Sequence, residues 1–157
     1  MKKTSPYFFG TVAANIVAYL GILRLLTTTG YDKLGEAVLP GGFPTKGASM
    51  VIWGLLFLLW TVGSYFVYTI KMTPKRHQNI FANGLILAAA IFAWHYVLLG
   101  VVNFPGVLAL SIAILLLTVI VWFMYLVTHR YGGYLFTPTV VWAAFMLYLG
   151  IALVVKN

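Results

Sequence analysis

The stretch VLALSIAILLLTVIVWFMYLVT, which runs from Val107 to Thr128, contains no charged residue, no glycine and no proline. At about 1.5 Å per residue, an α-helix of this length spans the roughly 30 Å of hydrocarbon in a lipid bilayer. The backbone cannot hydrogen-bond to water at that depth, so a helix that pairs its own polar groups is expected. This stretch therefore predicts a transmembrane helix.

Four further hydrophobic stretches of similar length fill most of the remaining chain. The five predicted spans cover roughly residues 7–27, 48–70, 80–102, 107–128 and 137–155. We therefore expect an all-α, multi-pass integral membrane protein, in which residues 1–157 form one domain, a bundle of five transmembrane helices. An odd number of spans places the two termini on opposite sides of the membrane.

The composition limits the classes of function. Of the 157 residues, 62% are hydrophobic and 8% are charged, which leaves little chain for a water-soluble domain. The net charge of +8 comes from short basic segments beside the spans, so we expect contact with the headgroups of the lipid bilayer and no binding of nucleic acid. The absence of cysteine excludes disulfide and thiolate chemistry.

The basic residues predict the orientation in the membrane. Four of the ten lysines and arginines lie on the same side as Asp32 and Glu36, and six lie on the side of the N-terminus. The six are Lys2, Lys3, Lys71, Lys75, Arg76 and Arg130. By the positive-inside rule, this distribution favours a cytoplasmic N-terminus and a C-terminus on the opposite side.

Among the connections between spans, only residues 28–47 form a long loop. This loop contains five glycines and two prolines, which disfavour a continuous helix. It is either a lid over one end of the bundle or a simple crossover. The segments 71–79, 103–106 and 129–134 are predicted to be short turns, which make sequential helices antiparallel.

Several kinds of chemistry are not indicated by the sequence. No aspartate or glutamate lies in a predicted span, which disfavours ion-coupled transport, proton pumping and paired-carboxylate catalysis. We therefore expect no catalytic residue and no metal site, and whether the protein is an enzyme stays open. His95 lies deep in the third span, where a lone histidine can ligate a haem iron, take a proton or, more commonly, hydrogen-bond to a neighbour.

Aromatic residues provide the positive signal. Trp53 and Phe57 share one face of the second span, Trp142 and Phe145 share one face of the fifth, and Trp94 lies in the third. Flat aromatic side chains can line a pocket for a flat, apolar ligand. The alternative is the belt of tryptophans that commonly forms at the membrane surface.

Small residues on the third span suggest a second feature. Gly84 and Ala88 lie four residues apart, a spacing that lets helices approach closely. The close approach can occur within one bundle or at an interface between protomers, and the sequence leaves both open.

Three of the spans carry motifs that match the signatures of one known protein family. The segment Pro138-Thr-Val-Val-Trp142-Ala-Ala-Phe145 keeps the proline, tryptophan and phenylalanine of the signature Pro-Tyr-Leu-x-Trp-x-x-Phe-Ala. The second span contains Trp53-Gly-Leu-Leu-Phe57, and the third keeps a tryptophan and a glycine six residues apart. In these motifs the chain resembles the TspO/MBR family, the tryptophan-rich sensory proteins and translocator proteins. The resemblance covers nearly the whole chain.

The resemblance implies a membrane receptor or carrier that binds porphyrin, haem or a similar hydrophobic ring, with sterols as a further ligand class. No cofactor is required, and a homodimer is an expected assembly. The implied ligand-binding residues are Trp53, Phe57, Trp94, Trp142, Phe145 and Leu149. By their charge, Arg24 and Lys46 beside the long loop are further candidates, for contact with ligand carboxylates. The alternative is a structural or regulatory partner subunit without a small ligand, which uses Gly84 and Ala88 as its interface.

Overall fold

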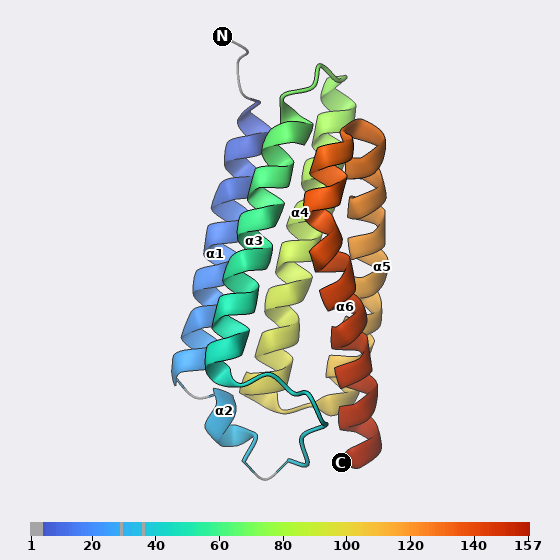
Figure 1. Ribbon diagram of the computed structural model, residues 1–157. Helices are drawn as coiled ribbons and strands as arrows, with labels where there is room; N and C mark the ends of the chain where they lie inside the picture. The colour runs from blue at the N-terminus through green and yellow to red at the C-terminus, as the bar shows by residue number, and fades with distance from the viewer. Residues whose placement is uncertain (1–4, 29, 36) are drawn as a thin grey trace.

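Figure 1 shows the computed structural model, which describes residues 5–28, 30–35 and 37–157, as an elongated bundle of helices. These residues contain no β-strand, and they include five helices long and apolar enough to cross a membrane. The five are α1 (Pro6–Thr28), α3 (Lys46–Tyr68), α4 (Pro74–His95), α5 (Phe104–Thr128) and α6 (Arg130–Lys156). The π-helix η1 (Tyr96–Val101) continues α4. The predicted membrane bundle of five helices is thereby confirmed.

The helices form a closed ring around a buried core. α1 packs against α3 and α4, α6 packs against α3 and α5, and α4 packs against α5. In the centre, the Trp60 indole donates a hydrogen bond of 3.1 Å to the Tyr125 hydroxyl, which lies 2.8 Å from the Ser64 hydroxyl. Because these polar groups are paired, their burial in an apolar core carries little cost.

Two helices, α4 and α6, begin well before the residues at which the hydrophobic pattern predicts them to begin. α4 begins at Pro74 and not near residue 80, because the Thr73 hydroxyl accepts a hydrogen bond from the Arg76 N–H and proline suits a first helical turn. α6 begins at Arg130 and not near residue 137, so that His129 alone separates it from α5. The basic and polar residues expected in turns therefore extend both helices beyond their apolar parts.

The glycines of the expected 129–134 turn serve helix packing instead. A Cβ atom on Gly63 of α3 would lie 2.9 Å from the Gly132 carbonyl oxygen of α6. A Cβ atom on Gly132 would lie 2.8 Å from a Val67 methyl group, which is also too close. Glycine at both positions lets the backbones of α3 and α6 touch, so the prediction of a turn here is wrong.

The long connection lies across the end of the bundle where α1 ends and α3 begins (Figure 1), as a lid would. It contains the short helix α2 (Gly30–Lys33), and we call residues 30–35 and 37–45 the lid. The Lys33 ammonium donates to the Gly100 carbonyl at 3.0 Å, which joins α2 to η1. The Asn157 side chain accepts from the Val38 N–H at 2.8 Å and donates to the Val38 carbonyl at 3.2 Å.

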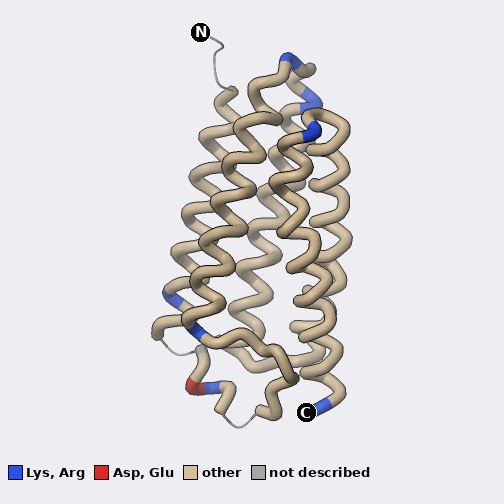
Figure 2. Tube along the Cα trace, in the orientation of Figure 1, with Lys and Arg blue, Asp and Glu red and all other residues tan. Residues whose placement is uncertain are grey.

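The charged residues lie at the two ends of the bundle (Figure 2). Lys71, Lys75, Arg76 and Arg130 lie where α1 begins, and Arg24, Lys33, Lys46 and Lys156 lie toward the lid. Because these described residues place four cations at each end, their charges favour neither orientation in the membrane. Lys2, Lys3 and Glu36, which the orientation prediction also used, lie outside the described residues, so the cytoplasmic N-terminus stays a prediction.

Candidate functional site

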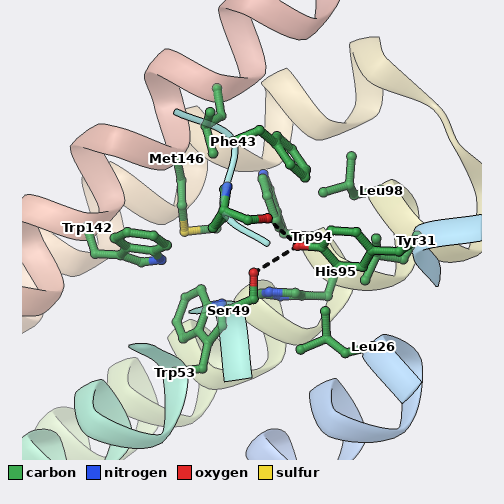
Figure 3. A pocket seen from close by; sticks show the side chains of 13 residues that line it. Leu26, Tyr31, Phe43, Ser49, Trp53, Trp94, His95, Leu98, Trp142 and Met146 are labelled. Atoms are coloured by element: carbon green, nitrogen blue, oxygen red, sulfur yellow. Dashed lines mark hydrogen bonds between the residues drawn. The ribbon is translucent and has the colours of Figure 1, made fainter. Parts of the chain in front are cut away.

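A cavity beneath the lid collects four of the predicted site residues (Figure 3). Trp53 comes from α3, Trp94 from α4, and Trp142 and Leu149 come from α6. The other lining residues are Leu26, Tyr31, Phe43, Pro44, Ser49, His95, Leu98, Leu99 and Met146. The cavity therefore lies among α1, α3, α4, η1 and α6, and the lid closes one end.

Trp53 occupies the centre of the aromatic wall. Its ring lies 4.9 Å from that of His95 and 6.3 Å from that of Trp142, in nearly perpendicular arrangements. Edge-to-face pairs of this kind each contribute about 0.5–1.5 kcal/mol beyond the burial of their area. These contacts fix the orientations of the Trp53, His95 and Trp142 rings relative to one another.

The two predicted phenylalanines lie behind this wall. Phe57 packs against Trp53 with ring centroids 5.8 Å apart, and Phe145 packs against Trp142 at 5.0 Å. Neither is among the residues that line the cavity. Phe57 and Phe145 therefore hold the Trp53 and Trp142 rings in position, and through these rings they influence the shape of the cavity.

The two predicted cations lie outside the cavity. Arg24 and Lys46 are exposed, and the Lys46 ammonium donates to the Thr27 carbonyl at 3.5 Å. Among the described residues, none of those that line the cavity carries a carboxylate, an ammonium or a guanidinium group. A charged part of a ligand could meet these two residues only at the lid end of the bundle.

Tyr31 supplies a polar group that the sequence did not reveal. Its hydroxyl donates to the Pro44 carbonyl at 2.7 Å and lies 2.9 Å from the Ser49 hydroxyl, as the dashed lines in Figure 3 show. Burial raises the pKa of Tyr31, and the Ser49 hydrogen bond partly offsets this rise. Tyr31 therefore stays protonated at neutral pH and ties α2 to the rest of the lid and to α3.

Trp142 holds a donor without an acceptor. Its indole nitrogen is buried and makes no hydrogen bond within the described part of the chain. The indole groups of Trp94 and Trp122, by contrast, donate to the Ser111 and Thr137 hydroxyls at 2.7 and 3.1 Å. An unpaired buried N–H is costly, so Trp142 is suited to a ligand that brings an acceptor.

The cavity is small in this conformation. Its volume is about 20 Å³, which holds about one water molecule. Tyr31, Phe43 and Pro44 of the lid form part of its wall, so a movement of the lid would enlarge it. A ring-shaped ligand requires such an enlargement.

Of the two predicted interface residues, Gly84 faces the bundle core and Ala88 borders a groove. A Cβ atom on Gly84 would meet the Trp60 ring at 3.4 Å, so this position faces α3. Ala88 is buried and lines a groove of about 510 Å³ between α1 and α4. Gly84 therefore allows α4 to approach a large core side chain of its own protomer.

These features define a class: an integral membrane protein with five helices in a ring and an aromatic cavity beneath a long connection. The model of the TspO/MBR family matches residues 10–155. The chain therefore belongs to the TspO/MBR family and is a membrane protein of sensory or carrier type. No curated protein matches it individually.

Proposed function

We propose that this protein is a membrane receptor or carrier that binds a flat, hydrophobic ring ligand of the porphyrin type beneath the lid. The observation that carries the proposal is the convergence of Trp53, Trp94 and Trp142, from three helices, on one cavity. Aromatic walls bind a flat ring through stacking and edge contacts, and an uncharged lining suits its apolar surface.

The polar groups around the cavity fit such a ligand. The Trp142 N–H offers a hydrogen bond to a carbonyl, carboxylate or ring nitrogen. The carboxylates of a porphyrin would remain toward the lid, where Arg24 and Lys46 are exposed to solvent or headgroups. The ring would thus enter the cavity with its apolar edge first.

Ligand entry would involve the lid, because its side chains occupy part of the space. A ligand that binds the open conformation shifts the population of the protein toward it. The surface at the lid end would then differ between the free and bound protein. In a receptor, this change of surface would signal that the ligand is bound. In a carrier, the same movement of the lid would admit the ligand.

Titration of the purified protein in nanodiscs with metal-free protoporphyrin IX tests the proposal. We expect saturable quenching of tryptophan fluorescence. Trp142→Phe keeps an aromatic ring but removes the unpaired N–H, so the Kd from porphyrin absorbance should rise by about three- to tenfold. Trp122→Phe, which alters a tryptophan remote from the cavity, is the matched control and should leave the Kd unchanged.

Two results would contradict the proposal. One is the absence of saturable binding by the wild-type protein, which would favour a partner subunit without a small ligand. The other is an equal change of Kd in Trp142→Phe and Trp122→Phe, which would place the ligand elsewhere on the protein or in the lipid.

The Asn157 contacts predict how firmly the lid is held. Asn157→Ala removes two hydrogen bonds to Val38, each worth about 0.5–1.5 kcal/mol, so the lid should open more often. Amide hydrogen exchange in peptides from residues 31–44 should accelerate by about three- to tenfold. Lys156→Ala, at the exposed neighbouring position, should leave it unchanged. Equal exchange in both variants would show that Asn157 does not hold the lid.

A further inference from the structure

The end of the bundle opposite the lid contains a polar pocket of about 440 Å³. It lies where α1 begins, α3 ends and α4 begins (Figure 1). The polar part of its lining comes from Ser5, Tyr68, Thr69, Lys71 and His77. An ammonium, an imidazole and hydroxyl groups are side-chain donors suited to the oxygens of a phosphate. The pocket therefore has the chemistry of a site for an anionic phosphate group.

Two of these groups have no hydrogen bond within the described part of the chain. The side chain of Lys71 is exposed there and unpaired, and Nε2 of His77 is buried without a partner. The rings of Tyr7 and Tyr68 stack on His77 with centroids 5.9 and 5.8 Å away, and they hold the imidazole in place. An unpaired buried polar atom is costly, so His77 favours a ligand that brings a hydrogen-bonding oxygen.

The surrounding charges also favour an anion. Lys75, Arg76 and Arg130 lie at the same end as Lys71 (Figure 2), and no carboxylate of a described residue lies there, since Asp32 belongs to α2 at the lid end. Because membrane-spanning helices end here, these cations lie at the depth of the lipid headgroups. Each basic residue near the membrane surface contributes about 1 kcal/mol to the attraction of anionic lipid.

An apolar groove of about 510 Å³ follows the pocket along the seam between α1 and α4. His77 of the pocket, Phe81 and Leu85 of the groove are spaced four residues apart, so they share one side of α4. The Phe81 ring rests on Gly10, where a Cβ atom would lie 2.8 Å from it. The floor of the groove consists of glycine and alanine, and the exposed Leu85 is part of its wall. The groove therefore begins beside the pocket and faces outward, toward lipid.

We propose that the pocket and the groove together bind one molecule of anionic phospholipid, with its phosphate at Lys71 and His77 and one acyl chain along the groove. Gly10 and Gly21 line the groove at its two ends, roughly 16 Å apart along α1. This length is about half of the hydrocarbon thickness of roughly 30 Å, which is the depth that one leaflet supplies. The site lies at the opposite end of the bundle from the lid, and it does not depend on the proposed binding of porphyrin.

A phospholipid matches both parts of this site, whereas a second copy of the chain matches only the groove. The sequence contains two acidic residues, Asp32 and Glu36, and both belong to the connection between α1 and α3. A second copy in the same orientation would therefore bring no acidic side chain to Lys71 and its neighbouring cations. It would cover the apolar groove and leave the donors of the pocket without an anion.

Native mass spectrometry of the protein in detergent, titrated with dioleoylphosphatidylglycerol, tests the pocket. We expect one bound lipid, with a Kd about fivefold or more below that of dioleoylphosphatidylcholine, whose choline cation the surrounding cations repel. Lys71→Gln should raise the Kd for phosphatidylglycerol by about three- to tenfold. Lys75→Gln is the matched control, because it removes the same charge at the same end from a residue that does not line the pocket. Its Kd should change by less than about twofold.

A second pair of variants tests the groove. Ala89→Leu fills its floor and should raise the Kd for both phospholipids by about threefold or more. Ala82→Leu, at an exposed position of α4 outside the groove, should leave both Kd values unchanged. Glycerol 3-phosphate, which has the phosphate but no acyl chain, should compete with the lipid only at far higher concentration.

Three results would overturn the proposal. Equal effects of Lys71→Gln and Lys75→Gln would mean that the attraction is a general effect of charge and that the pocket binds no phosphate. Equal effects of Ala89→Leu and Ala82→Leu, or competition by glycerol 3-phosphate at the concentration of the lipid, would remove the acyl chain from the groove. A fraction of dimer that falls in Ala89→Leu, without bound lipid in the wild-type protein, would show that a second copy occupies the groove.

Discussion

Gly63→Leu is expected to destabilise the bundle strongly, because it forces the backbones of two helices apart. The nearest atom to a new Cβ is the Gly132 carbonyl oxygen at 2.9 Å, which belongs to the backbone of α6. Backbone cannot rotate away as a flexible side chain can, so α3 and α6 must separate. Overpacking usually costs about 1–3 kcal/mol, and a rigid neighbour places this variant at or above the upper end.

The measurement is the fraction of monodisperse protein that remains after heating in detergent, from which an apparent Tm follows. We expect Gly63→Leu to lower it by about 10 °C or to prevent folding. Gly47→Leu is the matched control on the same helix, since a Cβ at Gly47 meets no atom within 4 Å. Similar Tm values for the two variants would show that the close approach of α3 and α6 is not needed.

The pattern of hydrophobic residues predicted the five helices because membrane depth demands continuous apolar stretches. It could not predict the helix ends, since Thr73 and Arg130 extend helices through polar residues that a hydropathy pattern assigns to turns. Gly132 shows most clearly what the sequence pattern cannot predict. A glycine that permits a turn and a glycine that permits helix contact are identical in sequence, and only the position of Gly63 distinguishes them.

The residues of the candidate site also divide into those that the sequence could predict and those that it could not. Trp53, Trp94 and Trp142 could be selected because their spacing and the family motifs coincide. Tyr31 and Ser49 could not, because their hydrogen bond depends on how the lid folds back over α3. The signal that could have drawn attention to the lid was its length, although length does not indicate which side chain points inward.

Trp53→Ala is expected to have the largest effect on ligand binding. Its ring contacts both Trp142 and His95, so it borders the proposed ligand on the central face of the cavity. Loss of the apolar contact area and of one aromatic partner should cost about 2–3 kcal/mol, roughly a hundredfold in Kd for metal-free protoporphyrin IX. Porphyrin absorbance gives this Kd independently of tryptophan fluorescence.

Trp122→Ala is the matched control, because it truncates a half-buried tryptophan whose indole hydrogen bond to Thr137 lies outside the cavity. Its Kd should stay within about twofold of the wild-type value. Trp53→Phe preserves a smaller ring and should fall between wild type and Trp53→Ala, which keeps the test valid if the alanine variant is unstable. The sign of the change is decisive, because removal of Trp53 also adds space to a cavity of about 20 Å³. Weaker binding would show that contact between the Trp53 ring and the ligand determines the affinity. Tighter binding would show that the small volume of the cavity limits the affinity, and it would contradict the role assigned to Trp53.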